Sequence, residues 1–464
     1  MNSKVIVKAA TILRKSSYIC RKKYHSHMLP IDRRILSLAL PSIIQNITVP
    51  LLGLVDLTIV GHLGSARAMG AIAVGSMMFN VLYWLLGFLR MGTSGLTSQA
   101  YGRNDAADAR RLLRRVLTIS IALGMLLIIV QRPLCWLAMR VIHPSADMVP
   151  LARLYFNICI WGAPAVLALY GLNGWFVGMQ DTRTPLYVAV AQNLLNIVAS
   201  LSLVYLLKLN IAGVALGTLT AQWFGLIVSA AFAMHRYQRL ASELAGPCHE
   251  QTTEWGRFFS VNRDIFIRTL FLVAVNLFFT SVGAREGDVI LSANTVLLTF
   301  YTLFSYIMDG FAFAGEAVCG SSFGSGDTAA FHLSVKRLFY WGWVMTVLFT
   351  VTYAFGGMPL VRFMTSEQSV LSAIRVYFPW VLLIPICGMA AFVYDGVFIG
   401  ITATRGMLIS SVTAALLFFA LFFSGMALRL PANHLLWCVY LVYLFSRGVG
   451  QFMWMRYSYA AKQN

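Results

Sequence analysis

Long apolar runs separated by short polar connections make up almost all of the chain after Arg34. There are twelve of them, and most reach the roughly 20 residues that a helix needs to cross about 30 Å of hydrocarbon. The third and ninth runs are marginal in length. Runs of this length predict helices rather than the shorter alternating strands of a membrane barrel. The runs cover residues 35–60, 69–90, 116–131, 154–177, 184–207, 211–234, 265–284, 289–318, 338–356, 376–398, 406–426 and 433–454.

The longest polar interruption, residues 237–263, lies between the sixth and seventh runs. It predicts a linker between an N-lobe at 31–236 and a C-lobe at 264–457, followed by a short tail at 458–464. Each lobe then holds six spans. We expect an all-α polytopic membrane protein of twelve transmembrane helices.

The first 30 residues are rich in Lys and Arg and carry no acid. They lack the apolar core of a secretory signal. A start of this composition is also found in mitochondrial presequences. We favour a basic cytoplasmic tail, or translation that begins at Met28.

An internal repeat with an offset of 222 residues links the two lobes. One offset that holds over about 120 residues indicates duplication. Because six spans is an even number, the second copy enters the membrane with the same topology as the first. This predicts pseudo-symmetric lobes related by an axis along the membrane normal, an arrangement typical of transporters that work by alternating access. The matching pairs are Val60 and Val282, Gly61 and Gly283, Ala71 and Ala293, Gly102 and Gly324, Asp105 and Asp327, Gly178 and Gly400, Thr182 and Thr404, and Arg183 and Arg405.

Composition supports the membrane assignment. Hydrophobic residues make up 59% of the 464 residues and charged residues only 11%, with a mean hydropathy of +0.73. A soluble domain carries about 25% charged residues, so this chain has too little polar surface for water. No nucleotide-binding motif, zinc spacing or nucleophile triad is evident, and we expect a protein that is not an enzyme.

The net charge of +19 is explained by topology rather than by a nucleic-acid partner. If the N-terminus is cytoplasmic, the tails and even-numbered connections hold 24 of the 36 Lys and Arg residues, the opposite side holds nine, and three lie within spans. This bias follows the positive-inside rule. It predicts that both termini face the cytoplasm.

Asp56 is the sharpest functional candidate, since an ionisable residue within a bilayer is costly and usually functional. It lies 22 residues after Arg34, so about 33 Å along a helix, in the periplasmic third of the first span. No basic residue lies three or four positions away. An unpaired carboxylate there can bind and release a proton, as a cation-coupled carrier requires. The alternative is a carboxylate near the interface that is solvated or bonded to hydroxyls.

Neutral polar residues in neighbouring spans can complete a site around Asp56. Asn196 and Ser200 lie on one face of the fifth span, and Thr218 lies in the sixth. The alternative is ordinary hydrogen bonding between helices. Pro41 removes a backbone hydrogen bond from the first span and predicts a bend there, which we expect protonation of Asp56 to alter, unless the proline only shapes packing.

Three further acids lie within spans of the C-lobe. Asp309 and Glu316 are seven residues apart on one face of the eighth span, and Asp395 lies in the tenth. They are expected to line the cavity of this lobe or to close its cytoplasmic gate. The alternative is pairing with a basic neighbour such as Arg268 or Arg447. Arg268 itself has Asp264 four residues before it, which predicts a local salt bridge.

At these residues the chain resembles the multidrug and toxic compound extrusion (MATE) family, and within it the DinF-like branch. The resemblance covers about residues 31–457. It implies a bacterial inner-membrane transporter that exports amphiphilic, often cationic, compounds in exchange for protons or sodium. The segments that carry it are LALPSIIQNITVPLLGLVDLTIVGHLGS, MGTSGLTSQAYGRND, NRDIFIRTLF, DGFAFAGEAVCGSSFGSGD and YDGVFIGITATR.

The resemblance also implies roles for individual residues. Asp56 matches the first-span acid of the family's N-lobe cation site, Pro41 resembles its bending proline, and Asn196 and Thr218 resemble its site companions. At the position of Ser200 several relatives carry an aspartate. Its absence leaves Asp56 as the only acid within the spans of the N-lobe and favours protons over sodium.

We therefore expect a monomeric, proton-coupled antiporter of small amphiphilic cations that works in the lipid bilayer, with no cofactor beyond an ion gradient. Three alternatives stay open. The first is sodium coupling. The second is a flippase for a lipid-linked oligosaccharide, which should have a strongly cationic cavity, whereas only Arg90, Arg268 and Arg447 lie within spans. The third is a receptor or scaffold, which would tolerate Asp56→Asn.

Overall fold

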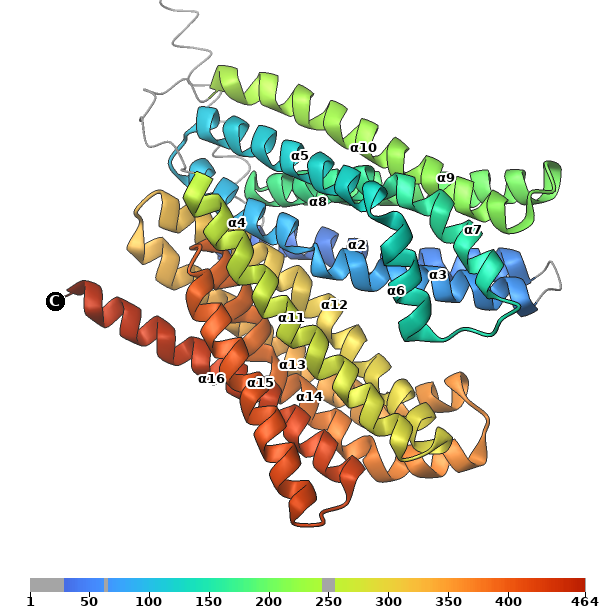
Figure 1. Cartoon of the computed structure of the whole chain (residues 1–464). Coiled ribbons are helices and arrows are strands. Elements are labelled where there is room, and N and C mark those ends of the chain that lie inside the picture. Colours follow the sequence, from blue (N-terminus) through green and yellow to red (C-terminus); the bar gives the residue numbers. More distant parts are fainter. Residues whose placement is uncertain (1–28, 62–65, 244–254, 464) are drawn as a thin grey trace, which may run out of the picture.

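A computed structural model describes residues 29–61, 66–243 and 255–463. Side chains are described in these ranges except at 49–57, 60–61, 66, 237–243 and 458–463. Within the described part the ordered elements are all helices (Figure 1). The predicted all-α membrane fold is confirmed.

The part of the N-lobe that the structure describes contains nine α-helices, of which α6 and α7 are short. A 3-10 turn at Ile160–Gly162 joins α7 to α8, and a π-helical segment at Ser202–Leu206 follows α9. The helices are α2 (Pro30–Gly61), α3 (Ala66–Leu85), α4 (Phe88–Gly102), α5 (Ala106–Ile129), α6 (Gln131–Ile142), α7 (Val149–Cys159), α8 (Ala163–Gly178), α9 (Arg183–Leu201) and α10 (Asn210–Glu243).

Between residues 255 and 463 the structure describes six helices of the C-lobe, each of at least 24 residues. They are α11 (Trp255–Arg285), α12 (Asp288–Gly324), α13 (Thr328–Met364), α14 (Gln368–Gly400), α15 (Thr404–Ala427) and α16 (Ala432–Gln463). Helices α10 and α11 both extend into the segment expected to be the linker.

Eight of the twelve predicted apolar runs lie within a single helix, and the other four, at 69–90, 116–131, 154–177 and 184–207, cross a junction between helical segments. The helix ends differ from the run ends. Eleven helical segments of the described part are long and apolar enough to cross a membrane, and α2, with 32 residues, lies outside that count. The two runs of marginal length belong to α5, with 24 residues, and α13, with 37. A helix continues past its apolar part because its backbone hydrogen bonds do not depend on side-chain polarity. The amphipathic α6 was not predicted, since 12 residues are too few to span a bilayer.

The two lobes meet at one end and diverge toward the other (Figure 1). Helices α4 and α8 of the N-lobe finish at the meeting end, as do α12 and α14 of the C-lobe. We call this the contact end. Helix α2 packs against both α9 and α12, so it bridges the lobes along its length.

Small residues let the helix backbones of the two lobes approach closely at the contact end. A Cβ atom on Gly102 would collide with the carbonyl oxygen of Ser321, and one on Gly324 would collide with that of Gln99. Gly95 lies in the same way against the carbonyl of Ile399. Close crossing through glycine is a common means of packing helices in membranes.

The 222-residue repeat is visible in the backbone. Asp105 caps α5 by accepting the N–H of Asp108 at 2.8 Å, and Asp327 caps α13 by accepting the N–H of Ala330 at 2.8 Å. Gln180 follows α8 with φ 63° and Thr402 follows α14 with φ 54°. Equivalent positions therefore share cap chemistry and left-handed backbone, which supports the predicted pseudo-symmetry of the lobes.

Candidate functional site

A buried ion pair joins the lobes between α4 and α12. The Arg90 guanidinium donates to both carboxylate oxygens of Glu316, at 3.1 and 3.3 Å. The Ser94 hydroxyl donates to the same carboxylate, and the guanidinium lies 3.8 Å from the centre of the Phe313 ring. Glu316 is 1% exposed. A two-pronged pair of this kind fixes orientation as well as distance.

A second charged cluster lies within the C-lobe, where α11, α14 and α16 meet. The Asp395 carboxylate accepts hydrogen bonds from Arg268, from Arg447 at 2.8 Å and from the Gln451 amide at 2.5 Å. Two guanidinium groups share one carboxylate, so the cluster carries a net positive charge. The alternative interpretation of Asp395, pairing with a basic neighbour, is the one that the structure supports.

The predicted local salt bridge between Arg268 and Asp264 is wrong. Asp264 instead accepts hydrogen bonds from Arg263 at 3.2 Å and from the Thr404 hydroxyl at 3.1 Å. Arg268 is 6% exposed and points into the lobe, where Asp395 neutralises it. Spacing along a helix permits a contact at i−4, but burial decides which carboxylate an arginine must find.

Asp309 differs from the other two acids of the C-lobe. It is half-buried, and within the described part of the chain it has neither a hydrogen bond nor an ion pair. Its electrostatic neighbours include Arg90 and Arg268 as well as the acids Glu316 and Asp395. The fold thus brings Asp309, Glu316 and Asp395 into one electrostatic group, with two of them neutralised and one available.

The N-lobe candidates lie on α9 and α10. The Asn196 amide donates to the Thr218 hydroxyl at 3.0 Å. The Asn196 carbonyl oxygen and the Ser200 hydroxyl are fully buried and find no hydrogen-bond partner among the described residues. Asn193 donates to the Thr48 carbonyl at 3.3 Å and so connects α9 to α2. The backbone of Asp56 lies within α2, but its side chain is outside the described residues.

Pro41 lies within α2, which runs as one helix from Pro30 to Gly61. The hydroxyl of the next residue, Ser42, donates to the Leu38 carbonyl at 3.0 Å. The prediction that this helix changes its bend on protonation stays a prediction.

Two hydrogen-bonded latches at the contact end were not foreseen from the sequence. In the first, Arg34 donates to the Gln180 side chain at 3.0 Å, and Gln180 donates to the Ala317 carbonyl at 2.7 Å. In the second, Arg257 donates to Gln99 at 2.8 Å and to Thr402 at 2.9 Å.

The two latches are pseudo-equivalent. Gln180 and Thr402 are 222 residues apart, and Arg34 and Arg257 are 223 apart. The first latch joins α2 to residues of both lobes, and the second joins α11 to residues of both lobes. Ser94 and Glu316, which bond to each other, are also 222 apart. The 222-residue offset was therefore a signal in the sequence for the Ser94–Glu316 contact and for the equivalence of the two latches.

Comparison with known proteins adds a family match. The family model described as MatE matches residues 41–202 and 265–423. DNA damage-inducible protein F of Escherichia coli is 34% identical over 94% of each chain. Multidrug resistance protein MdtK of Edwardsiella ictaluri is 23% identical over 87% of each chain. A crystal structure of MATE in the bent conformation superposes with a TM-score of 0.82 at 18% identity, over 93% of this chain and 96% of that one.

Proposed function

This chain belongs to the MATE family, and from that premise we propose that it is a secondary active exporter of small amphiphilic cations, coupled to protons through Asp56. Transport proceeds by alternating access of the two lobes. A relative carries the name of a multidrug resistance protein, which supports a broad range of organic substrates.

The observation that carries the coupling proposal is the pair of unsatisfied oxygens on α9. A buried polar atom without a partner is costly, by about 1–3 kcal/mol, and persists where something else binds it. The Asn196 carbonyl and the Ser200 hydroxyl are such atoms. Helix α9 packs on α2, the helix that contains Asp56. A site made of these neutral oxygens and one carboxylate suits a proton, or a water molecule that carries it. A site for sodium would be expected to contain several carboxylates.

The arrangement of the lobes supports the transport cycle. The latches and the Arg90–Glu316 pair hold the lobes together at the contact end, and the helices diverge at the other (Figure 1). Breaking these contacts would open the contact end. By the positive-inside bias this end faces the cytoplasm, so these contacts hold the described state closed on that side.

The pairing of buried cations counts against the flippase alternative. A flippase for a pyrophosphate-linked substrate needs unpaired positive charge in its cavity. Arg90 is bonded to Glu316, and Arg268 and Arg447 share Asp395. These arginines are already committed to carboxylates of the chain itself.

Inverted membrane vesicles with an acidified lumen test the proposal. A lipophilic cation such as ethidium is added, and the fluorescence of a pH dye in the lumen reports proton release. Wild type should release protons in exchange for the cation, and Asp56→Asn should not, because the amide cannot carry a proton across. Asp288→Asn removes an exposed acid at the start of α12 in the other lobe and is the matched control that should keep proton release.

A parallel series with a sodium gradient separates the coupling ions. Release that requires sodium would keep the exporter and overturn coupling to protons. Proton release retained by Asp56→Asn would overturn the role of this residue. No response of folded wild-type protein to a broad panel of cations would shift the assignment to the flippase.

A further inference from the structure

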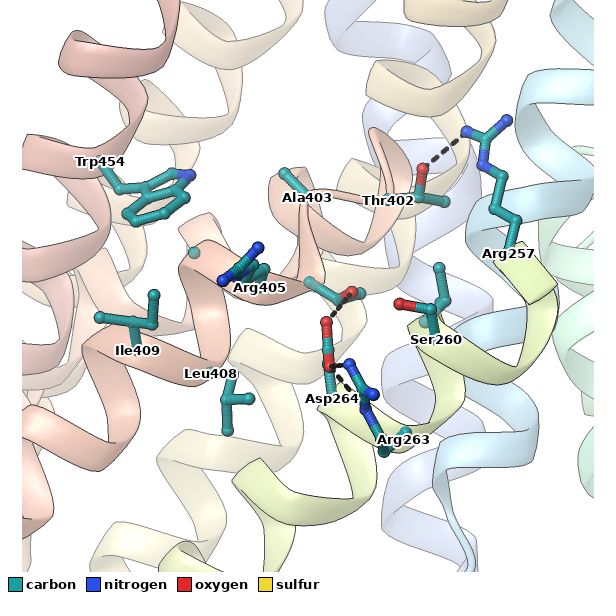
Figure 2. A pocket seen from close by; sticks show the side chains of 13 residues that line it. Arg257, Ser260, Arg263, Asp264, Thr402, Ala403, Arg405, Leu408, Ile409 and Trp454 are labelled. Carbon is teal, nitrogen blue, oxygen red and sulfur yellow. Dashed lines mark hydrogen bonds and ion pairs between the residues drawn. The ribbon is translucent and has the colours of Figure 1, made fainter.

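A hollow of about 710 Å³ lies at the contact end of the C-lobe, on the side of α11 and α15 (Figure 2). We call it the C-lobe hollow. It borders the second latch through Arg257 and Thr402, and it lies apart from the contacts between α9 and α10 and from the buried clusters around Glu316 and Asp395. Its polar lining includes Arg257, Arg263, Asp264, Thr404 and Arg405, and Trp454 of α16 forms one wall.

The hollow carries an excess of positive charge. Arg257, Arg263 and Arg405 line it, against the single carboxylate of Asp264. That carboxylate is already engaged by Arg263 and Thr404. Figure 2 shows Arg405 between Trp454 and Asp264, and no hydrogen bond or ion pair joins it to any residue that the structure describes. Its guanidinium is exposed and available to an anion.

Helix α15 begins in the wall of the hollow and adds to its attraction for anions. The helix starts at Thr404, and the preceding residue, Ala403, has no side chain that can accept its first N–H groups. Free N–H groups at a helix start attract negative charge, and the aligned peptide dipoles act in the same direction. This effect is local and adds to the charge of Arg405, the second residue of the helix.

The equivalent hollow of the N-lobe shows which kind of group binds at such a helix start. The pseudo-equivalent hollow there is smaller, about 410 Å³, and has Asp181 where the C-lobe has Ala403. The Asp181 carboxylate accepts the N–H groups of Arg183 and Thr184, both at 3.1 Å, and lies 3.8 Å from Arg236. The N-lobe thus supplies its own anion to the helix start. The C-lobe keeps the equivalent arginine, Arg405, but lacks the carboxylate.

The depth of the hollow indicates which anions reach it. In the predicted topology it lies at the membrane edge of the C-lobe, because the apolar run 406–426 begins beside it. Leu408 and Ile409, one turn deeper than Arg405, line it below the charged groups, and Ile409 is 42% exposed. Trp454 packs against Gly406 at the level of the charges, as tryptophan does at membrane interfaces. An anionic head group above an apolar body would match this lining.

We propose that the C-lobe hollow binds a phosphate-bearing anion at the membrane surface. The ligand is either the head group of an anionic phospholipid or a soluble phosphate compound. Basic pockets between transmembrane helices bind anionic head groups in this way. Arg405 and the start of α15 would hold the phosphate, and Leu408 with Ile409 would contact the glycerol and the first part of the acyl chains.

Native mass spectrometry of the full-length protein in detergent tests the proposal. The probes are phosphatidylglycerol, phosphatidylcholine and glycerol phosphate, each titrated separately. Wild type should bind phosphatidylglycerol more tightly than phosphatidylcholine. Arg405→Gln should weaken that binding about fivefold, which corresponds to about 1 kcal/mol for one arginine near an anionic surface. Arg183→Gln, at the equivalent position of the N-lobe, is the matched control and should leave binding unchanged.

Ala403→Asp provides an independent test that keeps every arginine. Asp181 shows that a carboxylate fits at the equivalent position, so this variant should fold and fill the site with its own anion. Selective binding should then disappear. Binding of glycerol phosphate that depends on Arg405, without selective binding of phosphatidylglycerol, would uphold the proposal with a soluble ligand. Binding of either probe that is the same in wild type, Arg405→Gln and Ala403→Asp would overturn it.

Discussion

At the residue scale, the buried charges divide into those that hold the structure and those that are available for chemistry. Glu316 and Asp395 are each bonded to arginine, at the boundary between the lobes and within the C-lobe respectively. An uncompensated charge is expensive in a low-dielectric interior, so these pairs are best understood as structural. Asp309 has no such partner among the described residues. Of these three acids it is the one whose carboxylate is not bonded to an arginine.

Removing the Asp395 charge should destabilise the protein strongly. Asp395→Asn would leave Arg268 and Arg447 buried without a counter-ion, which costs about 3–5 kcal/mol in comparable buried pairs. The midpoint of chemical unfolding in detergent measures this loss. Asp309→Asn is the control and should shift the midpoint little. Equal midpoints for the two variants would contradict the structural role of Asp395.

At the element scale, the crossing of α4 and α12 sets how closely the lobes approach. Gly102 and Gly324 occupy equivalent positions in the two helices, and each lies against the backbone of the other lobe. A backbone carbonyl cannot rotate away as a flexible side chain does, so an added methyl group must separate the helices. Helix ends were the least well predicted feature of these elements. An apolar run shows which part of a helix lies in the membrane, and not where the backbone hydrogen bonds of that helix end.

Gly102→Ala should therefore weaken the contact end even though alanine favours helix. Hydrogen exchange at residues 98–102 and 318–324 should become faster, since the helices can no longer close fully. Gly256→Ala is the matched control, because a Cβ atom there would have no heavy atom within 4 Å. It should not speed exchange, and the helix preference of alanine over glycine, about 0.5–1 kcal/mol, acts in its favour. Unchanged exchange in Gly102→Ala would show that the lobes do not rely on this crossing.

At the scale of the whole molecule, two pseudo-equivalent latches and one buried ion pair act together at the contact end. Each latch contains an arginine near the start of a lobe and a residue with left-handed backbone after α8 or α14. Non-glycine residues in this conformation are strained and persist where the surrounding contacts favour them. Hydrogen bonds at an exposed helix end are weak one by one, so release of both latches is compatible with a reversible cycle.

Loss of both latches should shift the protein away from the described state. The double variant Arg34→Ala with Arg257→Ala should speed hydrogen exchange at residues 318–324 more than either single variant, because the latches hold the same ends independently. Arg362→Ala, an exposed arginine at the far end of α13, is the control. If the double variant exchanges like wild type, the glycine crossing and the Arg90–Glu316 pair are sufficient to hold the contact end.

The helical fold, the repeat and the position of the spans follow from the sequence alone. A run of apolar residues has to lie in hydrocarbon whatever its neighbours are, so its length predicts a span without knowledge of the tertiary structure. The 222-residue offset is likewise visible in the amino-acid sequence itself. The acids Asp309, Glu316 and Asp395 were recognisable because charge within an apolar run is rare.

Only the tertiary structure decided what those charges do. Arg90 and Glu316 are separated by 226 positions, and Arg268 and Asp395 by 127. No local spacing relates such residues, and the local rule that was applied to Arg268 selected the wrong partner. Pairing depends on which helix faces are turned toward each other when the lobes pack, and hydropathy carries no information on that. The 222-residue offset shows that Ala403 stands where the N-lobe has Asp181, but only the tertiary structure shows that Asp181 accepts the first N–H groups of its helix and that Ala403 leaves those of α15 without a side-chain acceptor.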